Sequence, residues 1–214
     1  MRFSAKNFDA FIFDWDGTLS TSSLIVYLSH FFKKRYYPQY IISHSKEFSR
    51  PTRLQMEEYE GEAKAADFIY GLYTSMFRPK LREGALQLLK ELKSKGKKIA
   101  LYSDGANRRV ADELRDLGVE RYFDVIVTAG AYKVYKPNPA GIGIAAKKLG
   151  VKKERCLYVG DMAIDVFTAK FAHVKVAAVG NGLDPKSRLI DAKPDYLFES
   201  TQALARSIAQ HTTK

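Results

Sequence analysis

Short apolar runs alternate with longer amphipathic segments along most of the chain. The runs are as long as buried strands and rich in the β-branched and aromatic residues typical of them. Strands that alternate with helices predict a parallel sheet covered on both faces, a three-layer α/β core. The predicted strands are Ala10–Asp14, Lys98–Ser103, Asp124–Thr128, Cys156–Gly160, Val174–Val179 and Tyr196–Phe198.

Apolar residues between these strands recur every three or four positions, the spacing of one helix face. The stripes are Leu81, Ala85, Leu88, Leu89 and Leu92, before Gly96; Val110, Leu114 and Leu117; and Ile142, Ala145, Ala146 and Leu149. Asn138 and Pro139 predict the start of the third helix, as N-cap and first helical residue, and Gly150 its end. Two further helices are predicted over Met162–Phe171 and from Thr201 to about Gln210.

Residues 19–80 interrupt this alternation, because they contain no strand pattern. Segments 21–34 and 52–77 have helical spacing and many aromatic residues. We predict a core domain of residues 1–18 and 81–214 with an inserted helical cap at 19–80. The aromatic residues fit either the core of a small bundle or the lining of a substrate pocket.

Composition indicates a soluble globular protein, with 46% hydrophobic and 28% charged residues. No apolar run reaches the roughly 18 residues of a membrane helix, so no membrane partner is expected. The single cysteine, Cys156, excludes an internal disulfide, and a cytoplasmic protein is expected. The net charge of +11 is spread along the chain, which favours a small anionic substrate over nucleic acid. A monomer or small homo-oligomer is expected.

Polar residues lie at or just after the end of each of the first four predicted strands. They are Asp14, Asp16 and Thr18 after the first, Ser103 and Asp104 after the second, Lys133 and Lys136 after the third, and Asp161 and Asp165 after the fourth. Because ligands bind beyond the carboxyl ends of parallel strands, we expect these side chains to converge on one site.

Clustered carboxylates repel one another and need a cation to stay ionised together. Mg²⁺ suits such ligands, because it takes a few carboxylates and leaves positions for water and phosphate oxygens. One aspartate could then attack phosphorus, while another gives and takes a proton. The sequence therefore predicts Mg²⁺-assisted phosphoryl transfer from a small phosphorylated metabolite.

Each of these residues also has an ordinary structural interpretation. Asp-x-Asp-Gly and Asp104-Gly105 occur in common turns, and Asp161 could simply cap a helix. Their joint placement at successive strand ends favours the functional interpretation. By contrast, the G-x-G-x-x-A pattern from Gly141 to Ala146 lies inside a helix stripe, so it indicates close helix–sheet packing instead of a dinucleotide site.

Four segments, in this order, resemble the motifs of the haloacid dehalogenase superfamily: "DWDGTL", "SDG", "KPNP" and "GDMAID". The resemblance spans residues 8–200 and is strongest to its phosphoglycolate phosphatase and β-phosphoglucomutase-like branch. It implies a Rossmann-like core with a helical cap after the first strand.

The resemblance also implies roles for single residues. Asp14 matches the nucleophile and a Mg²⁺ ligand, and Asp16 the general acid/base, which also binds Mg²⁺ through its carbonyl. Ser103, Asp104 and Lys136 match the phosphate-binding positions, although an aspartate is unusual after the serine. Asp161 matches the acidic metal ligand, and Thr18 and Asp165 match supporting positions.

The sequence thus predicts a Mg²⁺-dependent phosphatase that hydrolyses a small phosphomonoester through an aspartyl phosphate. Two alternatives remain open: a phosphomutase of the β-phosphoglucomutase type, and a non-catalytic binding protein on the same fold. Arg50 and Arg53 in the cap are candidate contacts to an anionic substrate, or else solvated residues.

Overall fold

The computed structural model describes residues 3–21 and 79–210. The chain divides into two compact units, Met1–Thr21 with Lys80–Lys214, and Ser22–Pro79. The predicted cap at 19–80, with Arg50 and Arg53, lies almost entirely outside the described residues and stays a prediction. Leu19, Ser20, Thr21 and Lys80 belong to the first unit, which is therefore four residues longer than the predicted core of 1–18 and 81–214.

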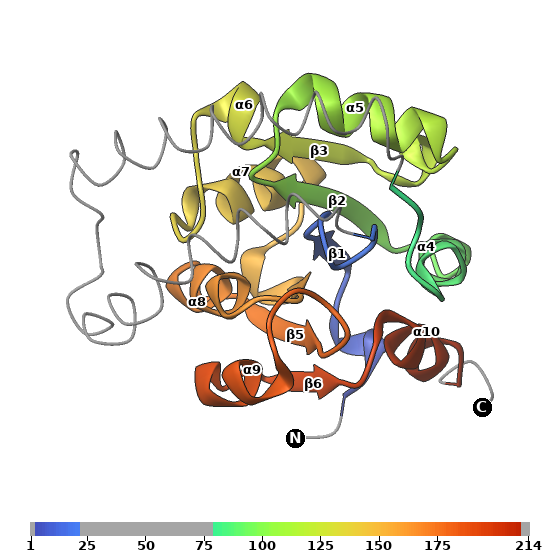
Figure 1. Cartoon of the computed structure of the whole chain (residues 1–214), viewed down its shortest axis with the longest axis vertical. Coiled ribbons are helices and arrows are strands. Elements are labelled where there is room, and N and C mark those ends of the chain that lie inside the picture. Colours follow the sequence, from blue (N-terminus) through green and yellow to red (C-terminus); the bar gives the residue numbers. More distant parts are fainter. Residues whose placement is uncertain (1–2, 22–78, 211–214) are drawn as a thin grey trace. The chain divides into compact units, whose positions relative to one another are not determined.

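Six parallel strands form one sheet in the order β3-β2-β1-β4-β5-β6 (Figure 1). The strands are β1 (Ala10–Phe13), β2 (Lys98–Ser103), β3 (Val125–Thr128), β4 (Cys156–Gly160), β5 (Lys175–Val179) and β6 (Tyr196–Phe198). The order reverses between β1 and β4, because β2 and β3 lie on one side of β1 and the later strands on the other. Such a reversal opens a crevice at the carboxyl ends of the two strands.

Helices cover both faces of the sheet and complete the three layers. They are α4 (Ala85–Ser94), α5 (Asn107–Asp116), α6 (Ala129–Tyr132), α7 (Ala140–Leu149), α8 (Ala163–Phe171), α9 (Lys186–Ala192) and α10 (Thr201–Gln210), with short 3-10 turns at Ala5–Asn7, Glu120–Tyr122 and Lys153–Arg155. Helices α4, α5 and α10 pack on one face, and α7, α8 and α9 on the other. Among the described helices, none is long and apolar enough to cross a membrane.

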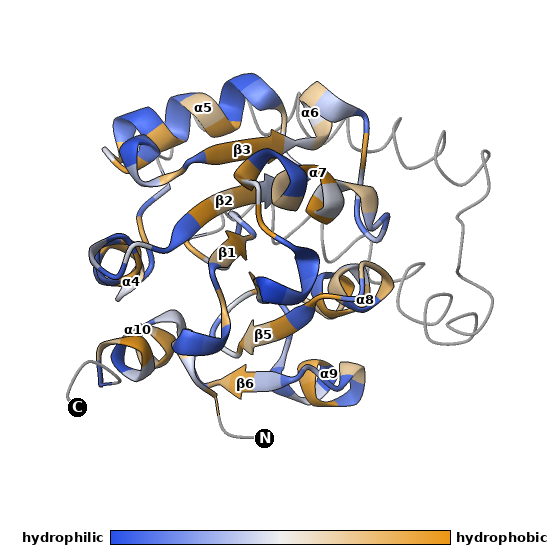
Figure 2. Cartoon of the chain, turned by 180° about the vertical axis from the view of Figure 1, so that it is seen from behind, coloured by the Kyte–Doolittle hydropathy of each residue, from blue (hydrophilic) through white to orange (hydrophobic). Residues whose placement is uncertain are grey.

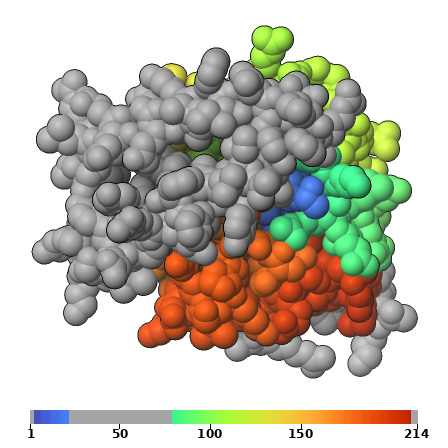
Figure 3. Space-filling model, viewed as in Figure 1, coloured from blue at the N-terminus to red at the C-terminus, as the bar shows by residue number. Residues whose placement is uncertain are grey.

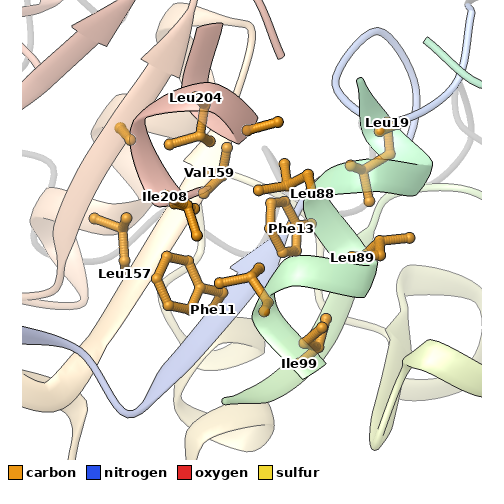
Figure 4. Packing of buried hydrophobic residues seen from close by; sticks show 14 of the residues in the cluster. Phe11, Phe13, Leu19, Leu88, Leu89, Ile99, Leu157, Val159, Leu204 and Ile208 are labelled. Carbon is orange, nitrogen blue, oxygen red and sulfur yellow. The ribbon is translucent and has the colours of Figure 1, made fainter. Parts of the chain in front are cut away.

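Alternate residues of each central strand supply the two hydrophobic clusters. Phe11 and Phe13 of β1 point into the first cluster, where Leu88 of α4 and Leu204 of α10 pack against them (Figure 4). Ile12 points into the second cluster, toward α7 and α8. The strands are therefore mostly apolar, whereas the helices carry both polar and apolar residues (Figure 2). This period-two division is what a sheet buried on both faces requires.

The predicted strands are confirmed to within one residue at each end. The predicted first helix is wrong at its start, because Leu81 forms an antiparallel bridge with Ser20 and α4 begins only at Ala85. Gly84, with a φ of 82°, has a left-handed backbone that cannot continue a helix. Helix α7 begins at Ala140, one residue later than predicted, and Asn138 Oδ1 still accepts the Ala140 N–H at 2.9 Å. The sequence analysis did not predict α6 or α9.

Candidate active site

Asp14 and Asp161 follow the two strands between which the sheet order reverses. The Asp14 N–H donates to the Val159 carbonyl at 2.9 Å, which continues the β1–β4 pairing by one residue. Asp161 directly follows β4. Both carboxylates are buried, and each has an oxygen within 4.8 Å of an oxygen of the other.

Lys136 brings the third strand's loop into this cluster. Its Nζ donates to Asp14 Oδ1 at 2.5 Å and to Asp165 Oδ1 at 2.7 Å. The rings of Tyr102 and Tyr158 both lie near the ammonium, with centroids 5.6 and 5.7 Å from Nζ. Two buried carboxylates thus share one buried cation, an arrangement that is costly to disrupt.

Four donors contact the carboxylate of Asp165, and its predicted supporting role stays a prediction. Lys136 Nζ and the Tyr158 hydroxyl donate to Oδ1, and the backbone N–H groups of Asp161 and Met162 donate to Oδ2. Asp165 therefore connects the lysine to the loop after β4 and fixes the turn into α8.

Thr18 links the two strand-end carboxylates. Its Oγ1 lies 2.7 Å from Asp161 Oδ1 and 3.3 Å from Asp14 Oδ2. Gly17 makes this turn possible, because its φ is +88° and a Cβ there would overlap the Asp161 carboxylate. The Leu183 N–H, in the loop after β5, donates to Asp161 Oδ2 at 2.6 Å.

Burial and mutual repulsion shift the ionisation of the cluster. Burial raises the pKa of Asp14 well above its usual range; Lys136 opposes the rise, and Asp165 and Asp161 add to it. Burial and the nearby Asp165 raise the pKa of Asp161 to about 7. Burial alone would lower the pKa of Lys136, but Asp14 and Asp165 raise it well above its usual value. The ammonium thus stays charged, while the two strand-end carboxyls resist ionisation without a further cation.

This donor set fits a hard divalent cation. Carboxylate oxygens of Asp14, Asp161 and Asp165 lie within 4.8 Å of one another, and all three residues are buried. Three carboxylates beside one ammonium leave excess negative charge, which Mg²⁺ could balance with oxygen ligands. Because four donors already contact Asp165, Asp14 and Asp161 are the better candidates to hold the ion.

Ser103 and Asp104 lie in the loop where β2 ends. Ser103 is buried, and its Oγ accepts the Gly105 N–H at 3.1 Å. Asp104 Oδ1 accepts the backbone N–H of Lys136 at 3.0 Å. The carboxylate of Asp104 thus braces the loop that carries Lys136, while phosphate binding by Ser103 and by the backbone of Asp104 stays a prediction.

Asp16 lies apart from the acidic cluster, in a second network that the sequence analysis did not predict. Both of its carboxylate oxygens accept from Arg109 on α5, and Glu113 contacts the same guanidinium. The sequence does contain a signal, because Glu113 interrupts the apolar stripe of Val110, Leu114 and Leu117. A carboxylate on the buried face of a helix requires a partner.

Comparisons with known proteins agree with this geometry. A sequence model of haloacid dehalogenase-like hydrolases matches residues 11–179, from β1 to β5. The chain belongs to this family of haloacid dehalogenase-like hydrolases. The family resemblance inferred from the four motifs is therefore confirmed, as are the α/β fold class and an enzyme of the phosphatase type.

Relatives of this haloacid dehalogenase-like hydrolase have phosphatase names. Pyrophosphatase PpaX of Halalkalibacterium halodurans is 30% identical over 200 residues, which cover 88% of this chain and 91% of that protein. Phosphoglycolate phosphatase 1 of Pseudomonas aeruginosa is 31% identical over 147 residues, 69% of this chain and 54% of that protein. A crystal structure from Thermotoga maritima, provisionally named a β-phosphoglucomutase, has the same fold, with a TM-score of 0.68 and 24% identity over 96% of this chain and 100% of that one.

Proposed function

We propose that the chain is a Mg²⁺-dependent phosphatase that hydrolyses a small phosphorylated metabolite through a phosphorylated Asp14. The observation that carries the proposal is the Lys136 ammonium between Asp14 and Asp165, beside Asp161. A nucleophilic carboxylate next to a fixed cation suits attack on an anionic phosphoryl group. When bound, Mg²⁺ would be held by Asp14 and Asp161 and would neutralise phosphate charge.

The two half-reactions need only residues of the core. An oxygen of Asp14 attacks phosphorus, and the bond from phosphorus to the leaving oxygen breaks while Asp16 gives that oxygen a proton. Water then attacks phosphorus, loses a proton to Asp16, and releases inorganic phosphate from Asp14. Lys136 and Ser103 hold the phosphoryl oxygens during both steps.

We expect Asp14→Asn to abolish turnover, because an amide is a poor nucleophile. Phosphate release is measured for p-nitrophenyl phosphate, pyrophosphate and 2-phosphoglycolate, with Mg²⁺ and with chelator. The matched control is Asp112→Asn, an exposed carboxylate on α5, which should retain wild-type activity. Substantial Mg²⁺-dependent activity in Asp14→Asn would refute the nucleophile assignment.

The same assay separates the alternatives. Transfer of the phosphoryl group to an added sugar hydroxyl in preference to water would indicate a phosphomutase, which uses the same core residues. Absence of any Asp14-dependent release or transfer would favour a non-catalytic binding protein. The names of the relatives make pyrophosphate and 2-phosphoglycolate the first substrates to test.

A further inference from the structure

Asp16 is fixed by a two-bond ion pair with Arg109. Nη1 of Arg109 donates to Oδ1 of Asp16 at 3.0 Å, and Nη2 donates to Oδ2 at 2.7 Å. The side chains are only 11% and 16% exposed. Two parallel bonds from a planar guanidinium set the orientation of a carboxylate, which a lysine cannot do.

Arg109 is itself held by a network that returns to the loop after β1. Its Nη1 lies 3.2 Å from Glu113 Oε1, one helical turn further along α5. Glu113 Oε2 accepts the indole N–H of Trp15 at 2.6 Å. Since Trp15 directly precedes Asp16, the guanidinium connects two neighbouring residues of one loop through α5.

The loop after β2 leaves room for this guanidinium. A Cβ on Gly105 would overlap Nη2 of Arg109. The guanidinium therefore lies between Asp16, in the loop after β1, and Gly105, which follows Ser103 and Asp104. Both of these loops carry residues that the proposed reaction uses.

The ion pair also separates Asp16 from the other acids. The metal-compatible cluster consists of Asp14, Asp161 and Asp165, and Lys136 is its cation. Asp16 has a different cation, Arg109. Two carboxylates only two positions apart are thus directed into different electrostatic environments.

We propose that Arg109 is a positioning residue for the acid/base carboxylate of Asp16. This inference rests on the proposed phosphatase function and deepens it. Arg109 holds the carboxylate of Asp16 in one orientation, outside the metal-compatible cluster, and this orientation serves proton transfer. Glu113 fixes Arg109, and Trp15 fixes Glu113.

The test compares Arg109→Met and Arg109→Lys with wild type by measuring kcat and KM for the best substrate found. We expect Arg109→Met to lower kcat by about 10- to 100-fold, the range typical of a misplaced catalytic group, with little change in KM. Arg109→Lys should recover only part of the loss, because it restores the charge but not the planar fork. The matched control is Arg108→Met, a neighbouring side chain that is 96% exposed, and it should behave as wild type.

A double-mutant cycle with Asp16→Asn distinguishes positioning from direct substrate binding. If Arg109 acts through Asp16, adding Arg109→Met to Asp16→Asn changes kcat by less than about 2-fold, within the usual additivity error. A further loss in that background, or a rise in KM alone, would overturn the inference.

If Arg109→Met folds poorly, Gly105→Ala tests the same inference. Its new methyl group displaces the end of the Arg109 side chain while the charge remains, and we expect the same loss of kcat. Wild-type kcat in folded Arg109→Met and Gly105→Ala would refute the inference and leave the phosphatase proposal standing. Absence of Asp14-dependent turnover in the wild-type protein would refute both.

Discussion

At the scale of single residues, the site depends on how each buried carboxylate is neutralised. Asp14 and Asp165 share the Lys136 ammonium, whereas the uncharged Thr18 hydroxyl and Leu183 N–H donate to Asp161. Uncharged donors stabilise a carboxylate less than an ammonium does. The ionisation of Asp161 should therefore respond to both pH and bound cations.

We predict that the metal-free protein loses stability as pH rises from about 4 to 7. The native state holds the Asp161 proton up to a pKa of about 7, whereas the unfolded chain releases it near 3.8. The native state then binds more protons across this window, so the free energy of unfolding falls with pH. Urea unfolding in chelator at several pH values measures this slope.

Asp161→Asn should flatten that slope, because it removes one of the groups that titrate. Part of the slope should remain, because the pKa of Asp14 is also raised in the native state. Added Mg²⁺ should reduce the slope in wild type, and Asp112→Asn should leave it unchanged. Equal slopes in wild type and Asp161→Asn would contradict the prediction.

Strand-end reasoning from the sequence identified the acidic cluster with Lys136 and Thr18, but not the Arg109–Asp16 pair or the Leu183 N–H. Asp14, Asp161 and Lys136 follow predicted strands, and such ends necessarily meet at one edge of a parallel sheet. The Arg109–Asp16 pair could not be predicted this way, because it depends on how α5 is rotated against the sheet. The Leu183 N–H in the loop after β5 could not be predicted either, because it is a backbone donor and the leucine side chain gives no sign of it.

At the scale of elements, helix α7 contains two glycines with opposite expected effects. A Cβ on Gly141 would overlap the ring of Tyr102, beside Lys136. A Cβ on Gly143 would meet no described atom within 4 Å outside its own helix. The first glycine of the G-x-G-x-x-A pattern, Gly141, is thus explained by the close packing of α7 on the sheet.

We predict that Gly141→Ala destabilises the protein by about 1–3 kcal/mol, the usual cost of overpacking. Gly143→Ala should stabilise it by about 0.5–1 kcal/mol, because alanine has the higher helix propensity. Chemical denaturation of both variants provides the measurement, and each serves as the other's control. Similar effects at the two positions would show that helix propensity, not contact with Tyr102, decides the outcome.

The strands were predictable because their apolar runs are continuous and end abruptly in polar residues. The order of strands in the sheet was not, because it depends on pairings between segments far apart in the sequence. Helix α9 has only two buried residues, Leu189 and Ala192, so its seven residues give almost no periodic signal. The start of α4 was missed because the apolar Leu81 fits the helix stripe but lies before Gly84.

At the scale of the whole molecule, the two ends of the described core chain, at Thr21 and Lys80, lie in contact where residues 22–79 are inserted. The Thr21 N–H donates to the Lys80 carbonyl at 2.7 Å, and the Lys80 N–H donates to Thr21 Oγ1 at 2.9 Å. Ser20 and Leu81 form an antiparallel bridge beside them. The N-terminal residues and those after Lys80 are visible side by side at the surface (Figure 3).

We therefore predict that residues 22–79 can be replaced by a short glycine-rich linker without unfolding the core. The two chain ends already pair as the strands of a hairpin do, so a few residues suffice to join them. Both hydrophobic clusters and every predicted site residue except Arg50 and Arg53 belong to the remaining unit. Circular dichroism and cooperative urea unfolding of the shortened protein test this.

The shortened protein also tests the proposed cap. If residues 22–79 select the substrate, it should still hydrolyse p-nitrophenyl phosphate in an Asp14-dependent way, but its KM values for different phosphomonoesters should become similar. Asp14→Asn in the shortened chain is the matched control. A folded core with unchanged discrimination between substrates would assign specificity to the core, and a chain that fails to fold would show that the core depends on residues 22–79.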